Sequence, residues 1–308
     1  MRILIAVDGS SSSDAVIQEA TARPWPKDTE MNLVTAVDPY FFTRAPLLLE
    51  EMKQRTNDTL EESAQPLRAA GLAVSTTVLV SNPRHGLPKT ASEWKADLIL
   101  LGSHGRGAFS RLLMGSTAQA VMRHAVCSVE IVRMKDKVRA ERPGMRVLIP
   151  TDGSECAQMA LSAVAEQPWP TSSEFLIIAC PEFPVIVGEY PYYAPEQLTE
   201  LAKGSEIHAA ESATEGADLL SKAGLRVSRQ VTEPRETPAR AILAAAESWE
   251  ADLIVMGSHG RRGFDRLVLG SVSESVALHA RCSVQVVRKA GIAGAQKIAD
   301  ALPERRPS

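Results

Sequence analysis

Short apolar runs alternate with longer segments of helical periodicity along the chain. Most of the runs are apolar at nearly every position, which is typical of parallel strands buried on both faces. In the N-terminal half the predicted strands are Ile3–Val7, Leu33–Val37, Val74–Val80, Leu98–Leu101 and Val129–Val132. The helices predicted between them are Ser12–Ala22, Leu47–Ala70, Arg84–Trp94 and Ser116–His124. This alternation predicts an α/β fold, with a parallel sheet, right-handed crossovers and helices on both faces.

The same motifs occur twice in the same order, which indicates an internal duplication. Arg2–Ser10 recurs as Arg146–Ser154, Pro24–Pro26 as Pro168–Pro170, Ala96–Arg106 as Ala251–Arg261, and His124–Arg133 as His279–Arg288. We therefore expect two domains of one kind, over residues 1–137 and 144–290, with a charged linker that ends in Pro143-Gly144. Residues 291–308 lose the pattern and are predicted to be a mobile tail.

The second copy is longer than the first. The offset between the copies is 144 residues at Arg2 and Arg146 but 155 residues at Gly102 and Gly257. Most of the added residues fall within 185–204, a stretch rich in proline and tyrosine. Closely spaced prolines interrupt both helices and strands, so this insertion is predicted to be a loop.

Composition narrows the class of protein. The 308 residues carry a formal net charge of -3, which gives no global basic field for nucleic acid. The first apolar run ends at Asp8 after five residues, too short for a signal peptide, and no segment approaches the roughly 20 apolar residues of a membrane span. The four cysteines show no CxxC spacing. We expect a cytoplasmic protein that binds neither nucleic acid nor membranes.

A glycine-patterned loop follows the fourth predicted strand of each copy. It reads Gly102-Ser-His-Gly105, nine residues, then Gly115-Ser116-Thr117; the second copy reads Gly257-Ser-His-Gly260, nine residues, then Gly270-Ser271. Glycine lets the backbone approach a phosphate closely, and the N-terminus of the following helix favours an anion. The spacing is neither the dinucleotide G-x-G-x-x-G nor a Walker loop with its lysine.

A second feature lies just after the first strand of each copy, the turns Asp8-Gly9-Ser10 and Asp152-Gly153-Ser154. Ligands of open parallel sheets bind beyond the carboxyl ends of the strands, where the winding direction reverses. If the first and fourth strands flank that point, the aspartate turn and the glycine loop face each other across one crevice.

The pattern G-x2-G-x9-G-[ST], with an early strand that ends in Asp-Gly-Ser, resembles the universal stress protein family in its tandem two-domain form. The resemblance covers nearly the whole chain except the insertion and the tail. It implies two doubly wound, five-stranded parallel-sheet domains related by a pseudo-twofold axis, Rossmann-like and similar to the adenine nucleotide alpha hydrolases. It also implies ATP in each crevice, with ADP or AMP as other occupants and Mg²⁺ as a companion of the nucleotide.

The resemblance assigns roles to matching residues. Asp8 and Asp152 would contact adenosine, and the backbone near Val37 and Cys180 would read the adenine edge. The phosphates and ribose would be held by the loop residues Gly102, Gly105, Gly115, Ser116 and Thr117, and by Gly257, Gly260, Gly270 and Ser271. The copies differ where Pro150-Thr151 replaces Ala6-Val7 and Cys180-Pro181 replaces Val37-Asp38. We therefore expect two sites of unequal affinity.

Several of these residues have simpler interpretations. Asp8 and Asp152 could simply cap a turn or the first helix, without contacting a ligand. Arg106 and Arg261 could clamp phosphates or lie in solvent. His104 and His259 could act as general bases, but a positioning role is favoured because no acidic residue repeats near them. Cys127 and Cys282 match each other and are expected to pack as small apolar side chains rather than act as a redox pair.

The last strand of each copy would otherwise expose an apolar edge. In the resembled family this strand pairs across a dimer axis, so the two halves are expected to form a pseudo-dimer within the chain, and a homodimer remains open. The leading functional hypothesis is a nucleotide-binding stress or regulatory protein without a catalytic residue. The alternatives are a slow ATP-hydrolysing enzyme, or an adaptor with empty crevices whose partner surface is the insertion. The sequence names no protein partner.

Overall fold

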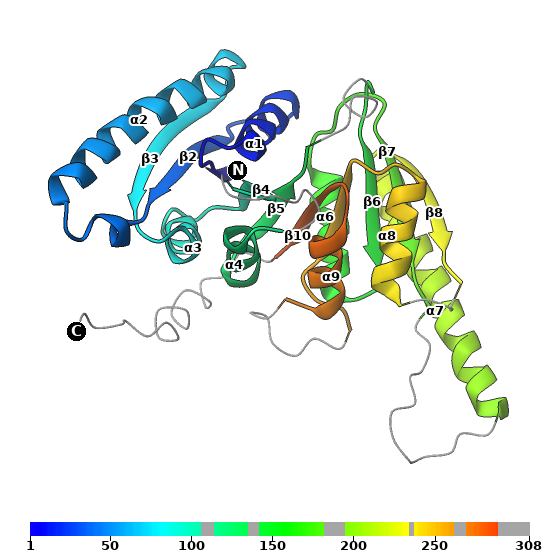
Figure 1. The fold of residues 1–308 in the computed structure, drawn as a ribbon. Helices are drawn as coiled ribbons and strands as arrows, with labels where there is room; N and C mark the ends of the chain where they lie inside the picture. Colours follow the sequence, from blue (N-terminus) through cyan, green and yellow to red (C-terminus); the bar gives the residue numbers. More distant parts are fainter. Residues whose placement is uncertain (106–113, 135–141, 182–194, 234–236, 262–268, 289–308) are drawn as a thin grey trace. The chain divides into compact units, whose positions relative to one another are not determined.

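A computed structural model describes residues 1–105, 114–134, 142–181, 195–233, 237–261 and 269–288. The chain divides into two compact units, the first built on Met1–Met134 and the second on Lys135–Val287. Each unit is an α/β domain whose five strands pair in parallel (Figure 1). The predicted tail, residues 291–308, lies outside the described residues.

The first unit contains five parallel strands in the order β3-β2-β1-β4-β5. Helices α1 and α2 pack on one face of this sheet, and α3 and α4 pack against each other on the other face (Figure 1). The elements are β1 (Arg2–Ala6), α1 (Ser11–Ala22), β2 (Glu30–Val37), the 3-10 helix η1 (Pro39–Phe42), α2 (Pro46–Ala69), β3 (Ala73–Val80), α3 (Pro83–Glu93), β4 (Leu98–Gly102), α4 (Ser116–His124) and β5 (Ser128–Val132).

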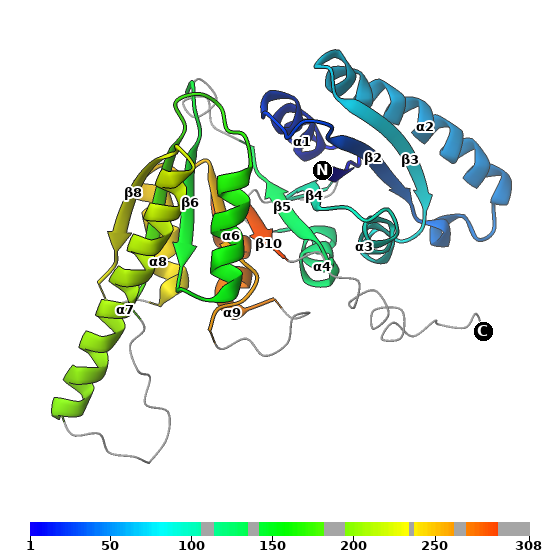
Figure 2. The same cartoon turned by 180° about the vertical axis from the view of Figure 1, so that it is seen from behind.

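The second unit repeats this plan, with parallel strands in the order β8-β7-β6-β9-β10. Figure 2 shows α6 and α7 on the sheet face opposite to α8 and α9. The elements are β6 (Arg146–Thr151), α6 (Glu155–Glu166), β7 (Glu174–Ala179), α7 (Pro195–Lys222), β8 (Arg226–Val231), α8 (Pro238–Ser248), β9 (Leu253–Gly257), α9 (Ser271–His279) and β10 (Ser283–Val287). The predicted fold class, two tandem doubly wound α/β domains, is confirmed.

Local sequence explains where the helices begin and end. Ser10 and Ser154 cap α1 and α6, because each side-chain oxygen accepts from the backbone N–H three residues later, at 3.4 and 3.3 Å. After α2 and α7 the chain turns at Gly71 and Gly224, whose φ angles are +83° and +79°. Only glycine adopts that left-handed conformation without strain.

How deeply a strand is buried depends on its position in the sheet, which the apolar runs alone did not reveal. The central strands β1 and β4 are almost wholly buried, whereas β3 and β8 are largely half-buried or exposed. Burial on both faces, predicted for most of the apolar runs, therefore does not hold for Val74–Val80, which lies in β3. The physical reason is helix cover: β3 packs against α2 and β8 against α7, and neither packs closely against a described helix on its other face.

The insertion also differs from the prediction. Residues 195–204, predicted as part of a loop, form the first turns of α7, which begins at Pro195. Proline suits this place because the first position of a helix needs no backbone N–H donor. Residues 182–194 lie outside the described part of the chain.

Candidate functional site

The aspartate turn and the glycine loop of the first unit follow neighbouring strands. Ala6 of β1 lies beside Leu101 of β4 in the parallel ladder, and the chain reaches β4 only after it has built β2 and β3 on the far side of β1. The winding direction therefore reverses between β1 and β4. This confirms the expected switch point, and it places both features at the carboxyl edge of the sheet.

Asp8 uses its two carboxylate oxygens differently. Oδ1 accepts the backbone N–H of Ser10 at 3.0 Å and the hydroxyl of Ser13 at 2.8 Å, so it holds the turn. Oδ2 lies against the loop: a Cβ added to Gly105 would be 2.7 Å from it. Oδ1 thus caps the turn, whereas Oδ2 lies close to the glycine loop.

Asp152 repeats this arrangement in the second unit. Its Oδ1 accepts the N–H of Ser154 at 3.0 Å, and its Oδ2 accepts the N–H of Arg261 at 3.0 Å. A Cβ on Gly260 would lie 2.6 Å from Oδ2. This turn has a further contact, because His208 of α7 hydrogen-bonds the backbone carbonyl of Asp152 through Nε2 at 3.0 Å.

Each glycine loop returns to the point where it leaves its strand. The N–H of Gly115 donates to the carbonyl of Ser103 at 2.7 Å, and the N–H of Gly270 donates to the carbonyl of Ser258 at 2.9 Å. These glycines are the N-caps of α4 and α9, and neither helix has a side-chain cap. The first-turn amides, with the exposed serine hydroxyls that follow, form a setting that favours an anion.

The glycines that end β4 and β9 are fixed by packing. A Cβ on Gly102 would lie 2.6 Å from Cβ of Ser12, and one on Gly257 would lie 2.6 Å from the backbone carbonyl of Cys156. The end of each strand thus lies so close to the first turn of α1 or α6 that no side chain fits between them. These contacts require glycine whether or not a ligand comes near.

The loop histidines lie inward. His104 Nδ1 hydrogen-bonds the hydroxyl of Ser103 at 2.9 Å, and His259 Nδ1 hydrogen-bonds that of Ser258 at 3.0 Å. Burial lowers the pKa of His104, and the nearby charge of Arg133 lowers it further. His104 is therefore neutral at pH 7, which fits the predicted positioning role better than that of a phosphate-binding cation.

The remaining predicted residues are spread around this edge. Val37, at the end of β2, is almost buried, and its carbonyl accepts the N–H of Ser81 at 3.1 Å. Cys180 follows β7 and is half-buried, and burial raises the pKa of its thiol. Thr117 lies in the first turn of α4, while Arg106 lies outside the described residues.

Arg84 is a site residue that sequence reasoning missed. It is the second residue of α3, and its Nη2 donates to the Ser116 hydroxyl at 2.8 Å. The available signal was its place just after the end of β3, at the same sheet edge as the glycine loop. The equivalent position in the second unit is Ala239, since Pro83 and Pro238 begin the matching helices.

The cysteines that match between the copies are packed inside. Cys127 and Cys282 form no disulfide and are 1% and 4% exposed. Burial raises the pKa of Cys127 to about 12, so the reactive thiolate is suppressed at neutral pH. Their expected role as small apolar side chains fits this environment.

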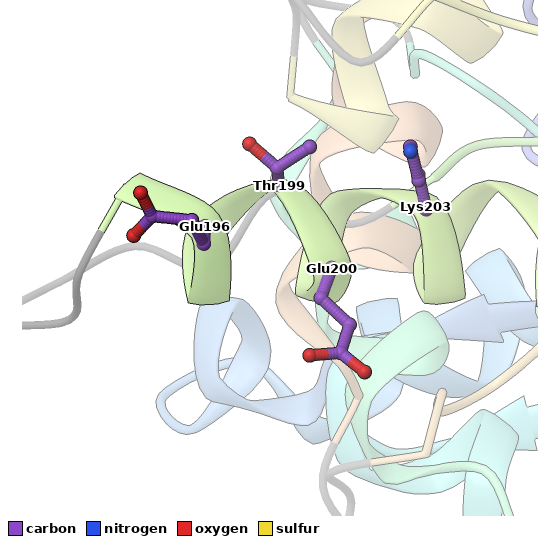
Figure 3. A pocket seen from close by; sticks show the side chains of 4 residues that line it. All are labelled: Glu196, Thr199, Glu200 and Lys203. Atoms are coloured by element: carbon purple, nitrogen blue, oxygen red, sulfur yellow. The ribbon is translucent and has the colours of Figure 1, made fainter.

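A hollow of about 450 Å³ lies elsewhere, along the first turns of α7. Glu196, Thr199, Glu200 and Lys203 line it; all are exposed and come from one helix, and Glu200 points away from Thr199 and Lys203 (Figure 3). It contains none of the predicted site residues. Within the described ranges, no cluster of three or more His, Cys, Asp or Glu could hold a metal ion, and no helix has the length and apolar character of a membrane span.

Comparisons with known proteins place the duplicated pattern in a family. A model described as the universal stress protein family matches residues 1–133 and 145–288. A universal stress protein of Mycobacterium tuberculosis is 27% identical over 300 residues, with 93% of this chain and 97% of that protein covered. One of Mycolicibacterium smegmatis is 27% identical over 296 residues, with 93% and 96% covered.

Solved structures show the same fold. The crystal structure of a universal stress protein from Archaeoglobus fulgidus matches with a TM-score of 0.64 at 22% identity, over 93% of this chain and 98% of that chain. A universal stress protein described as putative, from Pseudomonas aeruginosa, matches with a TM-score of 0.59 at 14% identity, over 97% and 96%.

Proposed function

This chain belongs to the universal stress protein family, and we propose that it binds adenine nucleotides, ATP foremost, in the crevice of each unit. One observation carries the proposal. In both units an aspartate oxygen lies too close to the loop glycine for a side chain there: a Cβ would be 2.7 Å from it at Gly105 and 2.6 Å at Gly260. The aspartate and the glycine loop thus form one closely fitted wall in two copies, although the surrounding residues differ.

The residues present fit a nucleotide. The backbone amides at the starts of α4 and α9 are not capped by side chains, and Ser116 and Ser271 expose hydroxyl donors beside them. This combination stabilises phosphate oxygens. Asp8 and Asp152 offer carboxylate acceptors, which suit ribose hydroxyls. Mg²⁺ would enter with the phosphates that it neutralises.

We propose that the bound nucleotide has a regulatory role in a cytoplasmic stress response. The glycine loop joins the end of a strand to the start of a helix, so a nucleotide bound to its glycines would contact both elements. Occupancy would bias the conformation of this loop, and through it the choice of a protein partner. The neutral, inward His104 supports holding the nucleotide rather than transferring a phosphoryl group.

Equilibrium dialysis with ATP, ADP and AMP tests this proposal on the full chain. Gly105→Asp and Gly260→Asp each place a carboxylate against Asp8 or Asp152, so each should abolish binding in its own unit. We expect about two nucleotides per wild-type chain, about one per single variant and none for the double variant. Gly204→Asp is the matched control, because a Cβ there meets nothing within 4 Å.

Mass spectrometry of ligand released from protein purified without added nucleotide gives an independent measurement. Adenine nucleotide at a fixed ratio to protein would support the proposal, and ADP alone would favour the hydrolytic alternative. No binding of any of the three nucleotides to the wild-type chain would exclude the proposed function.

A further inference from the structure

A guanidinium group lies at the N-terminus of α4 in the first unit. Arg84 Nη2 donates to the Ser116 hydroxyl at 2.8 Å, although the two residues are 32 positions apart in the sequence. Ser116 is the first residue of α4, and Gly115 before it supplies no side-chain cap. The phosphate-binding end of the candidate site therefore includes a cation from a different helix.

The backbone of Arg84 is held in place by a short chain of hydrogen bonds. The Asn82 Oδ1 accepts the N–H of Arg84 at 3.1 Å, and the Asn82 Nδ2 donates to Asp38 Oδ2 at 2.7 Å. Asp38 follows β2, so the start of α3 is tied to the neighbouring strand end. This anchor fixes the point from which the arginine side chain reaches toward Ser116.

The electrostatics of this contact favour a bound anion. A helix N-terminus is positive, and cations are normally stabilised at the opposite end. In the part of the chain that the structure describes, Arg84 has no carboxylate in ion-pair range. Ser116 accepts the hydrogen bond from Arg84, so its own hydroxyl proton remains free to be donated. Two positive groups and one donor thus meet at a single exposed point.

The second unit lacks this arginine. Ala239 occupies the equivalent position of α8, and Thr237 stands where the first unit has Asn82. The neighbouring Arg240 is exposed and donates to no residue that the structure describes. The helix N-terminus of α9 therefore has to attract phosphate without a guanidinium group from α8.

We propose that Arg84 binds the phosphate chain in the first site and gives that site a preference for ATP over AMP that the second site lacks. The inference rests on the proposed function, since it assigns a specificity residue to the same crevice. Attraction to a guanidinium group grows with the number of anionic phosphates, and Arg84 forms charge-assisted hydrogen bonds that an alanine cannot.

Isothermal titration of the full chain measures the preference directly. In a Gly260→Asp background only the first site binds. There, Arg84→Ala should weaken ATP binding about tenfold and AMP binding less than about threefold. Arg84→Lys should retain part of the ATP preference, because it keeps the charge but loses the planar fork. Arg55→Ala, an exposed arginine of α2 paired with Glu51, is the control for loss of one positive charge.

The reciprocal variant tests the same idea from the other unit. In a Gly105→Asp background only the second site binds, and Ala239→Arg should raise its affinity for ATP severalfold and its affinity for AMP less. Both Arg84 and its anchor Asn82 are exposed, so the unfolding midpoint should not change on substitution of Arg84.

Two results would overturn the inference while leaving the proposed function intact. One is ATP binding that is unchanged by Arg84→Ala. The other is an equal loss of ATP and AMP affinity, which would indicate a structural effect. Absence of nucleotide binding by the wild-type chain would instead remove the proposed function itself.

Discussion

The two units place different chemistry at one buried position of the same fold. In the first unit, Arg23 after α1 and Glu130 of β5 form an ion pair at 2.8 Å, with side chains 1% and 0% exposed. In the second unit the equivalent residues are Gln167 and Gln285. Glycine spacing and strand order are identical in both, so the fold tolerates either an ion pair or two neutral glutamines at these positions.

The same contrast extends to the candidate site. Ser13 bonds Asp8 in the first unit, whereas Ala157 takes its place in the second, where His208 bonds the backbone carbonyl of Asp152. The two units share the backbone path at the glycine loop, because the matching glycines lie too close to their neighbours for a Cβ. Side-chain partners differ because several polar arrangements can satisfy one carboxylate. The comparison teaches that the glycine loop is the constant feature and the charges around it are adjustable.

The largest effect is expected at the buried pair. Glu130→Gln should destabilise the first unit by about 3–5 kcal/mol, since it leaves the Arg23 guanidinium group buried without its carboxylate. Arg23→Gln combined with Glu130→Gln copies the second unit and should recover most of that loss. Urea unfolding of the wild-type chain and these two variants measures the difference.

Glu61→Gln is the matched control, because Glu61 pairs with Arg68 at 2.8 Å but is 41% exposed. Its expected effect is much smaller than that of Glu130→Gln, because solvent screens an exposed ion pair. A double variant no more stable than Glu130→Gln would mean that the first unit, unlike the second, requires the charges.

A smaller effect is expected where the two loops are alike. Gly257→Ala should destabilise the second unit by about 1–3 kcal/mol, because the new Cβ would meet backbone atoms of Cys156 at 2.6 Å. Gly102→Ala should cost the first unit somewhat less, since its nearest atom belongs to the Ser12 side chain.

Gly204→Ala should have the opposite sign and stabilise α7 by about 0.5–1 kcal/mol, because this helical glycine has open space around it. Thermal unfolding compares the three glycine variants. Equal destabilisation by all of them would show that the close approach at the strand ends is not the cause.

Loss of the Ser13 hydroxyl should cost about 1 kcal/mol in the first unit. Ser13 is 5% exposed, donates to Asp8 Oδ1 at 2.8 Å and accepts from the Asp8 N–H at 2.9 Å, so Ser13→Ala leaves the Asp8 amide without that acceptor. Ala157→Ser is the reciprocal change in the second unit and should be close to neutral. Chemical denaturation measures both, and a stronger effect in the second unit would contradict this account.

The smallest effect concerns pH. Burial lowers the pKa of His104 below its usual 6.5, so the unfolded chain binds a proton more readily than the folded one. The stability of the first unit should therefore be constant above pH 6.5 and fall as the pH drops below it. His104→Asn should flatten this dependence in unfolding curves between pH 7 and 5, and an unchanged slope would assign it to other groups.

Local sequence was sufficient for the elements themselves. The predicted helix Ser116–His124 has the same bounds in the structure, and the residues that cap helices, Ser10, Gly71 and Gly224, are of the types that local sequence favours there. Apolar period and capping residues act over a few neighbouring positions, so a single sequence reveals them. The burial of β3 was predicted less well, because burial depends on which helices cover a strand. The start of α7 was also missed, because proline can begin a helix as well as interrupt one.

Sequence alone thus determined the duplication, the parallel-sheet class and the glycine loops, all of which are written in local spacing. The pairing of the last strands and the bound nucleotide stay predictions. Only the tertiary structure showed that Arg23 meets Glu130 across 107 residues and that Arg84 reaches Ser116 across 32. Such contacts depend on how helices pack onto a sheet, and no periodicity along the chain records which side chains that packing brings together.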